Sequence, residues 1–176
     1  MRTSPPRTAH RHSLGPASRW QDYLPLVVVI AVALLAATAL HVGESVPDRG
    51  HGWMLDAMGL FLAIFSMFKF FDLSGFADGF QMYDLLAKRA RAYALFYPFV
   101  ELGLALGYLA RWRLPAVYGI TVMVMLFGAL GVIGALRRKL DLDCACLGTV
   151  LRVPLSTVAL TEDVGMAVMA AVLWAQ

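Results

Sequence analysis

Two cysteines, Cys144 and Cys146, form the segment of this sequence with the clearest capacity for chemistry. One alanine separates them, and Gly148 follows two residues later and permits a tight turn of the backbone. Two thiols at this spacing can form a strained, easily reduced disulfide, which suits thiol–disulfide exchange. The same two thiolates can instead hold one soft metal ion. A third interpretation gives them no chemistry, because free cysteine also packs as a small apolar residue.

Three carboxylates lie deep inside long apolar runs of the chain: Glu101, Glu162 and Asp163. An ionisable side chain at membrane depth is costly unless it is paired, hydrated or protonated, so these residues are candidate functional groups. We expect Glu101 or Glu162 to face the interior of the protein and to relay protons. The alternative is a structural hydrogen bond to a neighbouring helix. Because adjacent helical residues point about 100° apart, Glu162 and Asp163 cannot serve one site equally.

The composition indicates that these groups lie in a membrane protein. Of the 176 residues, 60% are hydrophobic and only 15% are charged, whereas soluble domains are about 45–50% apolar and about 25% charged. The net charge of +3 does not indicate nucleic acid as a partner, because the basic residues form short blocks between apolar runs. The sequence therefore predicts an all-α integral membrane bundle whose partner is the lipid bilayer. It contains no phosphate loop, HExxH pair or nucleophile elbow, and whether the protein is an enzyme stays open.

The N-terminal part divides into a polar tail and one apolar run. Residues 1–23 are rich in arginine, proline and serine and have no apolar period, which predicts a disordered tail. Residues 24–42 predict an N-terminal transmembrane helix. The alternative is a signal peptide, since small residues follow the apolar stretch.

A four-helix membrane domain is predicted over residues 53–175. Its spans are the apolar runs 53–71, 93–110, 115–136 and 155–174. Lys69, at the end of its span, is expected to snorkel toward the membrane surface. Residues 72–92 predict a short amphipathic helix in the headgroup region, because apolar side chains recur there at helical spacing; they are Phe76, Phe80, Tyr83 and Ala87.

Glycines predict where these helices approach one another closely. Gly103 and Gly107 form a GxxxG spacing in the third run of the chain, and further glycines occupy the second half of the next. These are Gly128, Gly131 and Gly134. We expect both groups to lie at helix–helix contacts in an up-and-down bundle.

The distribution of basic residues predicts the orientation. Most of them lie in the 1–23 tail, in residues 88–91 and in residues 137–152, and few lie in the alternate loops. The positive-inside rule places the first group in the cytoplasm. With five spans, the N-terminus and the cysteine pair are then cytoplasmic.

The order of motifs resembles the MauE proteins of methylamine utilisation, which are grouped with DoxX-like, redox-associated membrane proteins. The resemblance covers about residues 53–174 and rests on four segments: Lys69-Phe-Phe-Asp72, Phe76–Tyr83, Pro98 with Glu101-Leu-Gly103, and Cys144-Ala-Cys146-Leu-Gly148. It implies a four-helix bundle in the bacterial inner membrane. It also implies a role in maturing methylamine dehydrogenase, through thiol or disulfide equivalents handled for its disulfide-rich small subunit.

Our first hypothesis is therefore a thiol-redox membrane protein that assists maturation of an exported enzyme and needs no cofactor. Cys144 and Cys146 exchange electrons in it, and Glu101 or Glu162 relays protons. The alternative is a protein that binds or transports a soft metal such as copper or mercury. It would use the same cysteines together with methionines and the tail histidines His10 and His12.

Overall fold

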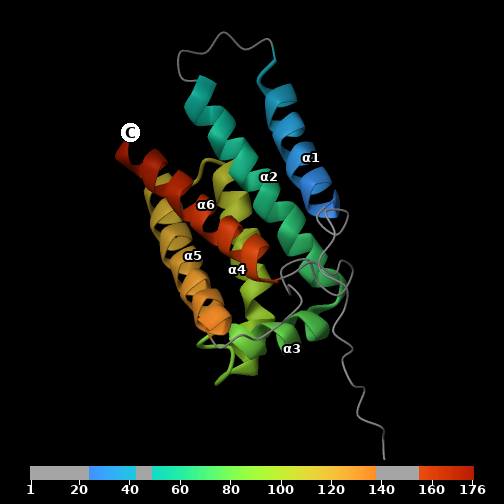
Figure 1. Cartoon of the computed structure of the whole chain (residues 1–176). Coiled ribbons are helices and arrows are strands. Elements are labelled where there is room, and N and C mark those ends of the chain that lie inside the picture. Colours follow the sequence, from blue (N-terminus) through green and yellow to red (C-terminus); the bar gives the residue numbers. More distant parts are fainter. Residues whose placement is uncertain (1–23, 43–48, 138–154) are drawn as a thin grey trace, which may run out of the picture.

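The computed structural model describes residues 24–42, 49–137 and 155–176, and every regular element in these ranges is an α-helix. The helices are α1 (Leu24–Leu40), α2 (Arg49–Phe71), α3 (Leu73–Tyr83), α4 (Arg91–Leu109), α5 (Leu114–Arg137) and α6 (Leu155–Ala175). In Figure 1 the other helices run up and down along the molecule, and α3 lies across one end. The all-α prediction is confirmed for the described residues.

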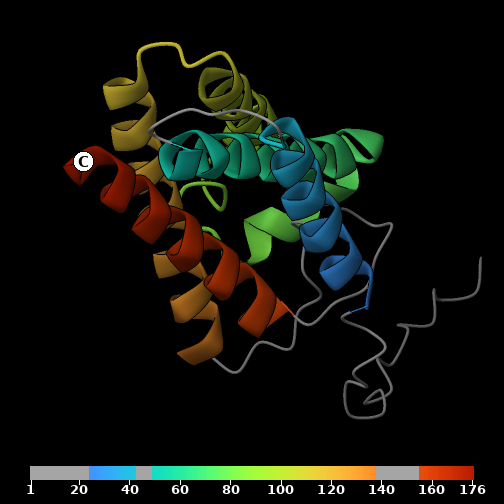
Figure 2. The same cartoon turned by 90° about the horizontal axis from the view of Figure 1, so that it is seen from above.

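The long helices pack mainly as two pairs. The most extensive contacts join α5 to α6 and α2 to α4, while α1 packs on α2. Figure 2 shows α5 and α6 on one side of the molecule, with α2, α4 and α1 on the other. Direct contact between α2 and α6 is sparse. The space between the two pairs is therefore where buried cavities are expected.

Three segments of the described residues are long and apolar enough to cross a membrane: Gly50–Phe71, Arg91–Leu109 and Leu114–Arg137. Leu26–Leu40 is a shorter apolar helix. The prediction of a multi-helix membrane protein is confirmed at this level, while the exact set of five spans stays a prediction. The observed helices begin and end close to the predicted runs, except that α2 begins at Arg49, before the predicted run 53–71.

The short helix α3 closes one end of the bundle. Asp72 caps its N-terminus, where a carboxylate oxygen accepts from the Gly75 backbone N–H at 2.8 Å. The predicted apolar face is present and buried, but it packs on protein and not on lipid. Its side chains contribute to an aromatic core with residues of α2, α4 and α5. Helix α3 therefore covers the space between the two helix pairs at this end.

The glycine predictions hold only in part. A Cβ at Gly107 would lie 2.7 Å from the Val117 side chain, so α4 and α5 approach closely there. Gly103 is exposed, and a Cβ on it would meet nothing within 4 Å. The prediction that both GxxxG glycines lie at a helix contact is therefore wrong for Gly103. On α5, Gly131 lies against the Tyr83 carbonyl, whereas Gly134 faces open space.

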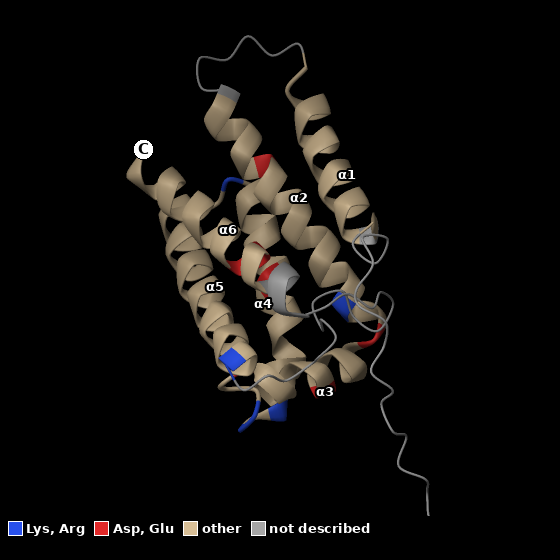
Figure 3. Ribbon diagram, in the orientation of Figure 1, with Lys and Arg blue, Asp and Glu red and all other residues tan. Residues whose placement is uncertain are grey.

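Charged residues lie at both ends and in the middle of the bundle. Figure 3 shows basic ribbon at the end where α3 lies and in the α4–α5 turn, and acidic ribbon both partway along the bundle and at the α3 end. Arg91 and Arg137 belong to the first end, at the start of α4 and the close of α5. Arg111 and Arg113 lie in the α4–α5 turn at the opposite end, where both adopt the left-handed backbone conformation, with φ of 52° and 46°.

Candidate functional site

A buried ion pair joins the two helices of the α2–α4 pair. Lys69 of α2 donates to both carboxylate oxygens of Glu101 of α4, and each side chain is only 2% exposed. Removal of two opposite charges from water is costly, and their mutual attraction compensates only when both remain together. The burial of Glu101 agrees with its expected interior position. The prediction that Lys69 snorkels to the membrane surface is wrong, because its side chain is buried. Helix α3 covers it, and Glu101 pairs with it inside the bundle.

Aromatic rings surround the Lys69 ammonium group. The nitrogen lies 5.5 Å from the ring centroid of Phe76 and 5.4 Å from that of Tyr97. At these distances the negative faces of the rings attract the cation. Phe80 and Tyr83 line the same small cavity. The in-plane helix predicted from sequence thus provides part of the wall of a charged site.

Glu162 and Asp163 bring two further carboxylates to this cavity from α6. They line it together with Lys69 and Glu101, and its volume is about 20 Å³. A space of that size holds about one water molecule. Asp163 lies directly against Gly128 of α5, where a Cβ would come within 2.9 Å of a carboxylate oxygen. Gly128 therefore leaves the room that the Asp163 side chain occupies.

The charges lining this cavity do not balance. Glu101, Glu162 and Asp163 supply three carboxylates, and Lys69 is the one basic residue among the described side chains that line it. Like charges this close inside a membrane cannot all remain ionised without compensation. Bound protons or an additional cation must supply the difference. The cluster of Lys69, Glu101, Glu162 and Asp163, called here the carboxylate cluster, is therefore suited to hold and release protons.

Glu162 also borders a second, larger space. A cleft of about 380 Å³ lies between α1, α2 and α6, and Glu162 is among the residues that line it. Asp163 is not among them. Both neighbours thus line the small cavity, against the expectation that they cannot serve one site equally, and Glu162 alone of the two also lines the cleft.

A separate polar centre lies at the opposite end of the bundle. Asp56 of α2 is buried, and its Oδ2 lies 2.9 Å from His41 Nε2 and 3.2 Å from Arg111 Nη2. Nearby, Trp53 Nε1 donates to Thr38 Oγ1 at 3.1 Å. These contacts tie the end of α1 and the α4–α5 turn to the start of α2. His41, Asp56 and Arg111 line neither cavity, whereas Trp53 also lines the cleft.

The structure describes only some of the site residues predicted from the sequence. Cys144 and Cys146 lie outside the described residues. Glu101 and Glu162 come together in the carboxylate cluster. Lys69 was not predicted as a site residue, although a lysine in an apolar run signals a partner on another helix.

The fold and the cluster define an α-helical membrane protein with an ionisable site inside the bundle. The sequence profile of a family described as methylamine utilisation protein MauE matches residues 51–176. The chain belongs to this family, and it is thus a membrane protein associated with methylamine utilisation. No curated protein and no solved structure matches it. The matched region includes all four residues of the carboxylate cluster, whereas α1 precedes it.

Proposed function

We propose that this protein exchanges thiol and disulfide equivalents through Cys144 and Cys146 in the bacterial inner membrane. Its role is to assist maturation of an exported enzyme of methylamine metabolism. Membership of the MauE family supports the pathway. The resemblance noted in the sequence suggests methylamine dehydrogenase, whose small subunit is rich in disulfides, as the client.

The carboxylate cluster is the observation that carries this proposal. Thiol–disulfide exchange begins with a thiolate, so a proton must leave one thiol and later return to another. In the exchange itself the Cys144–Cys146 disulfide becomes a dithiol while a client dithiol becomes a disulfide, and electrons and protons balance without another reactant. Buried carboxylates that outnumber their cation supply a place inside the membrane where such protons can reside. A purely structural bundle has no need of three carboxylates in one small cavity.

Mutation of the cysteines tests the thiol chemistry. We expect Cys144→Ser, Cys146→Ser and the double variant to abolish growth on methylamine equally, because a disulfide needs both sulfurs. The oxidation state of the dehydrogenase small subunit, read by mass-tagged alkylation, should change with growth. A single-serine variant with full activity contradicts a shared role for the two thiols. A matched control is Ser74→Ala, which removes an exposed hydroxyl that donates to Asp72 at the N-terminus of α3.

The side of the membrane is tested in the same cells. The excess of basic residues supports a cytoplasmic location for the N-terminus and the α3 end. On that side the cysteines, in their dithiol form, should react with an impermeant thiol reagent only after lysis. Labelling in cells whose outer membrane alone has been opened would reverse this topology.

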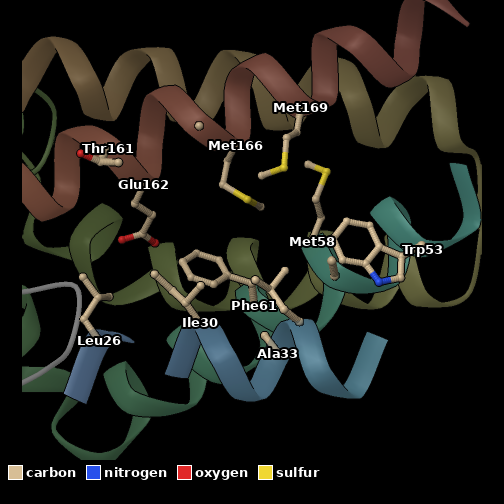
Figure 4. Close-up of a pocket in the computed structure, with 13 residues that line it drawn as sticks. Leu26, Ile30, Ala33, Trp53, Met58, Phe61, Thr161, Glu162, Met166 and Met169 are labelled. Carbon is tan, nitrogen blue, oxygen red and sulfur yellow. The ribbon is translucent and has the colours of Figure 1, made fainter. Parts of the chain in front are cut away.

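The described methionines favour one second candidate, a soft-metal binding protein. Met58, Met166 and Met169 all line the cleft, and Figure 4 shows their sulfur atoms directed into the same part of it. Thioether sulfur is a ligand that Cu(I) prefers. Titration of the purified protein with Cu(I) against a competing chelator should then show one tight site. Substitution of Met58, Met166 and Met169 by leucine should remove that site, and an unchanged affinity would reject this candidate.

A further inference from the structure

The cleft between α1, α2 and α6 is apolar along most of its length. Its walls include Ile30 of α1, Trp53 and Phe61 of α2, and Met166 of α6. Figure 4 shows these side chains facing one another, with Glu162 reaching from α6 toward α1. At about 380 Å³ the cleft is large enough for a small organic molecule. An apolar occupant drawn from the membrane suits such walls.

Glu162 gives the cleft one polar position, and its depth restricts the occupant. The residue follows the start of α6 at Leu155 by seven positions, which is about 10 Å along a helix. That depth lies within the hydrocarbon core, which is about 30 Å thick. Phospholipid headgroups remain near the surface, and the phosphate of a lipid would be repelled by the carboxylate cluster. A fatty-acid carboxylate is disfavoured for the same reason of charge.

A neutral molecule with a hydrogen-bonding oxygen fits these restrictions. Glu162 in its carboxylic acid form donates to a carbonyl oxygen, and in its carboxylate form it accepts from a hydroxyl. Trp53, Phe61 and the methionine sulfurs provide faces on which a flat ring can pack. We propose that the cleft binds a lipid-soluble quinone, with the ring oxygen at Glu162 and the apolar tail between α1 and α2.

Glu162 connects this quinone site to a source of protons. It lines both the cleft and the small cavity that contains the Lys69–Glu101 pair. A quinone that accepts two electrons must also accept two protons to become a quinol. Glu162 can deliver a proton to the ring oxygen and regain one from the remainder of the cluster. The cleft and the cluster thus form one continuous unit for proton-coupled chemistry.

The electrons link this site to the thiols, and this step rests on the function proposed above. When Cys144 and Cys146 are oxidised, two S–H bonds break and one S–S bond forms. The two electrons and two protons released are those that convert one quinone into one quinol. The quinone then serves as the acceptor that returns the cysteine pair to its disulfide form after each exchange.

Binding is tested on the full-length protein in quinone-free nanodiscs with tritiated decylubiquinone as the probe. We expect saturable binding of one molecule per chain. Gly165 lines the cleft, and a Cβ there meets nothing within 4 Å, so Gly165→Leu adds a side chain to the cleft from a backbone position that has room for its Cβ. It should weaken binding at least tenfold. The matched control is Gly134→Leu on α5, which also extends into open space but lies outside the cleft.

Several outcomes overturn the proposal. The first is the absence of saturable binding. The second is equal binding by both glycine variants with unchanged melting temperatures. The third is competition by decylbenzene, which has the tail but no ring oxygen, as strong as that by the quinone. The last result would identify an acyl-chain site. The double cysteine-to-serine variant separates the two proposals, because it should bind the probe normally. If the probe binds but the cysteines are not needed for maturation, the thiol function is rejected. If the cysteines are needed but the probe does not bind, the quinone site is rejected.

Discussion

Two buried carboxylates, one near the end of the bundle opposite α3 and one partway along it, have opposite arrangements of partners. Asp56 meets two nitrogen partners, and one of them, Arg111, has a side chain that is 48% exposed and so remains in contact with water. Among the described residues Glu101 pairs with Lys69, both side chains are 2% exposed, and two more carboxylates from α6 line the same cavity. Around Asp56 the nitrogen partners outnumber the carboxylate, whereas around Glu101 the carboxylates outnumber the lysine.

This difference separates a structural contact from a site suited to chemistry. The Asp56 group joins three parts of the chain that meet at one end, and its charge is compensated locally. The carboxylate cluster is compensated only when protons or a cation bind, so its charge depends on what is bound. We therefore expect substitutions at Asp56 to affect mainly stability, and substitutions in the cluster to affect function beyond any effect on stability.

The largest expected effect follows removal of the single cation. Lys69→Met leaves Glu101 buried without its partner and should cost about 3–5 kcal/mol of unfolding free energy. Thermal unfolding in detergent and the yield of folded protein measure it. The double variant Lys69→Met with Glu101→Leu should recover most of that stability, because no unpaired charge remains. It should nevertheless stay inactive, and an active double variant would show that the ion pair has only a structural role.

Asp56→Ala should have a smaller effect on stability. It removes a carboxylate shared by His41 and Arg111, and loss of such buried polar contacts costs about 1–3 kcal/mol. The melting temperature should fall, while growth on methylamine at permissive temperature should persist. If Asp56→Ala eliminates growth while the protein remains folded, the contrast between the two carboxylates fails.

Glu162→Gln isolates proton handling from packing. The amide has nearly the shape of the carboxylic acid but cannot release its proton, so we expect stability to change by less than about 1 kcal/mol. Maturation of the client should fall at least tenfold. The control is Asp78→Asn, which makes the same chemical change at an exposed carboxylate paired with Arg91. Equal activity of the two variants would remove Glu162 from the mechanism.

Asp84 lies in the connection after α3, outside the carboxylate cluster. Its Oδ1 accepts from the Leu86 and Ala87 backbone N–H groups at 2.9 and 2.8 Å, while Oδ2 is buried and has no hydrogen-bond partner among the described residues. Burial raises the pKa of this carboxyl above its usual value, against the effect of the backbone N–H groups and Lys88. The folded protein therefore retains this proton more readily than the unfolded chain does.

Asp84→Asn should for that reason stabilise the protein at neutral and alkaline pH, where the wild-type side chain carries a buried charge. We expect the melting temperature to rise by about 2–4 °C, because the amide oxygen can still accept both backbone bonds. The gain should shrink as the pH falls toward the ordinary range of aspartate, since the wild-type carboxyl is then neutral as well. A gain that is independent of pH would assign the effect to packing.

The sequence predicted the local features of the fold better than its distant contacts. Apolar runs and charge blocks located the helices closely, because each span must satisfy its own backbone inside lipid. The apolar spacing from Phe76 to Tyr83 correctly predicted a helix, but spacing alone cannot distinguish lipid from protein as the surface that its face covers. The same limit explains Gly103, which has the spacing of a packing residue and yet faces outward.

The site was predictable only where one residue was unusual by itself. A carboxylate such as Glu101 inside an apolar run is conspicuous in any sequence. Its partner Lys69 lies 32 residues earlier, near the end of its own span, where snorkelling is the simplest local interpretation. The cleft depends on how far α1 and α6 stand apart around α2, which no periodicity encodes.

The position of two acids in the last helix also has a consequence for biosynthesis. A helix that enters the bilayer alone is penalised by about 2.5–3.5 kcal/mol for an aspartate near its centre, and α6 carries Glu162 and Asp163 together. By the time α6 leaves the ribosome, α2 and α4 are already made, and Lys69 offers a positive charge beside Glu101. We therefore expect stable insertion of α6 to depend on the earlier helices. Lys69 would then both complete the charged site and help α6 to insert.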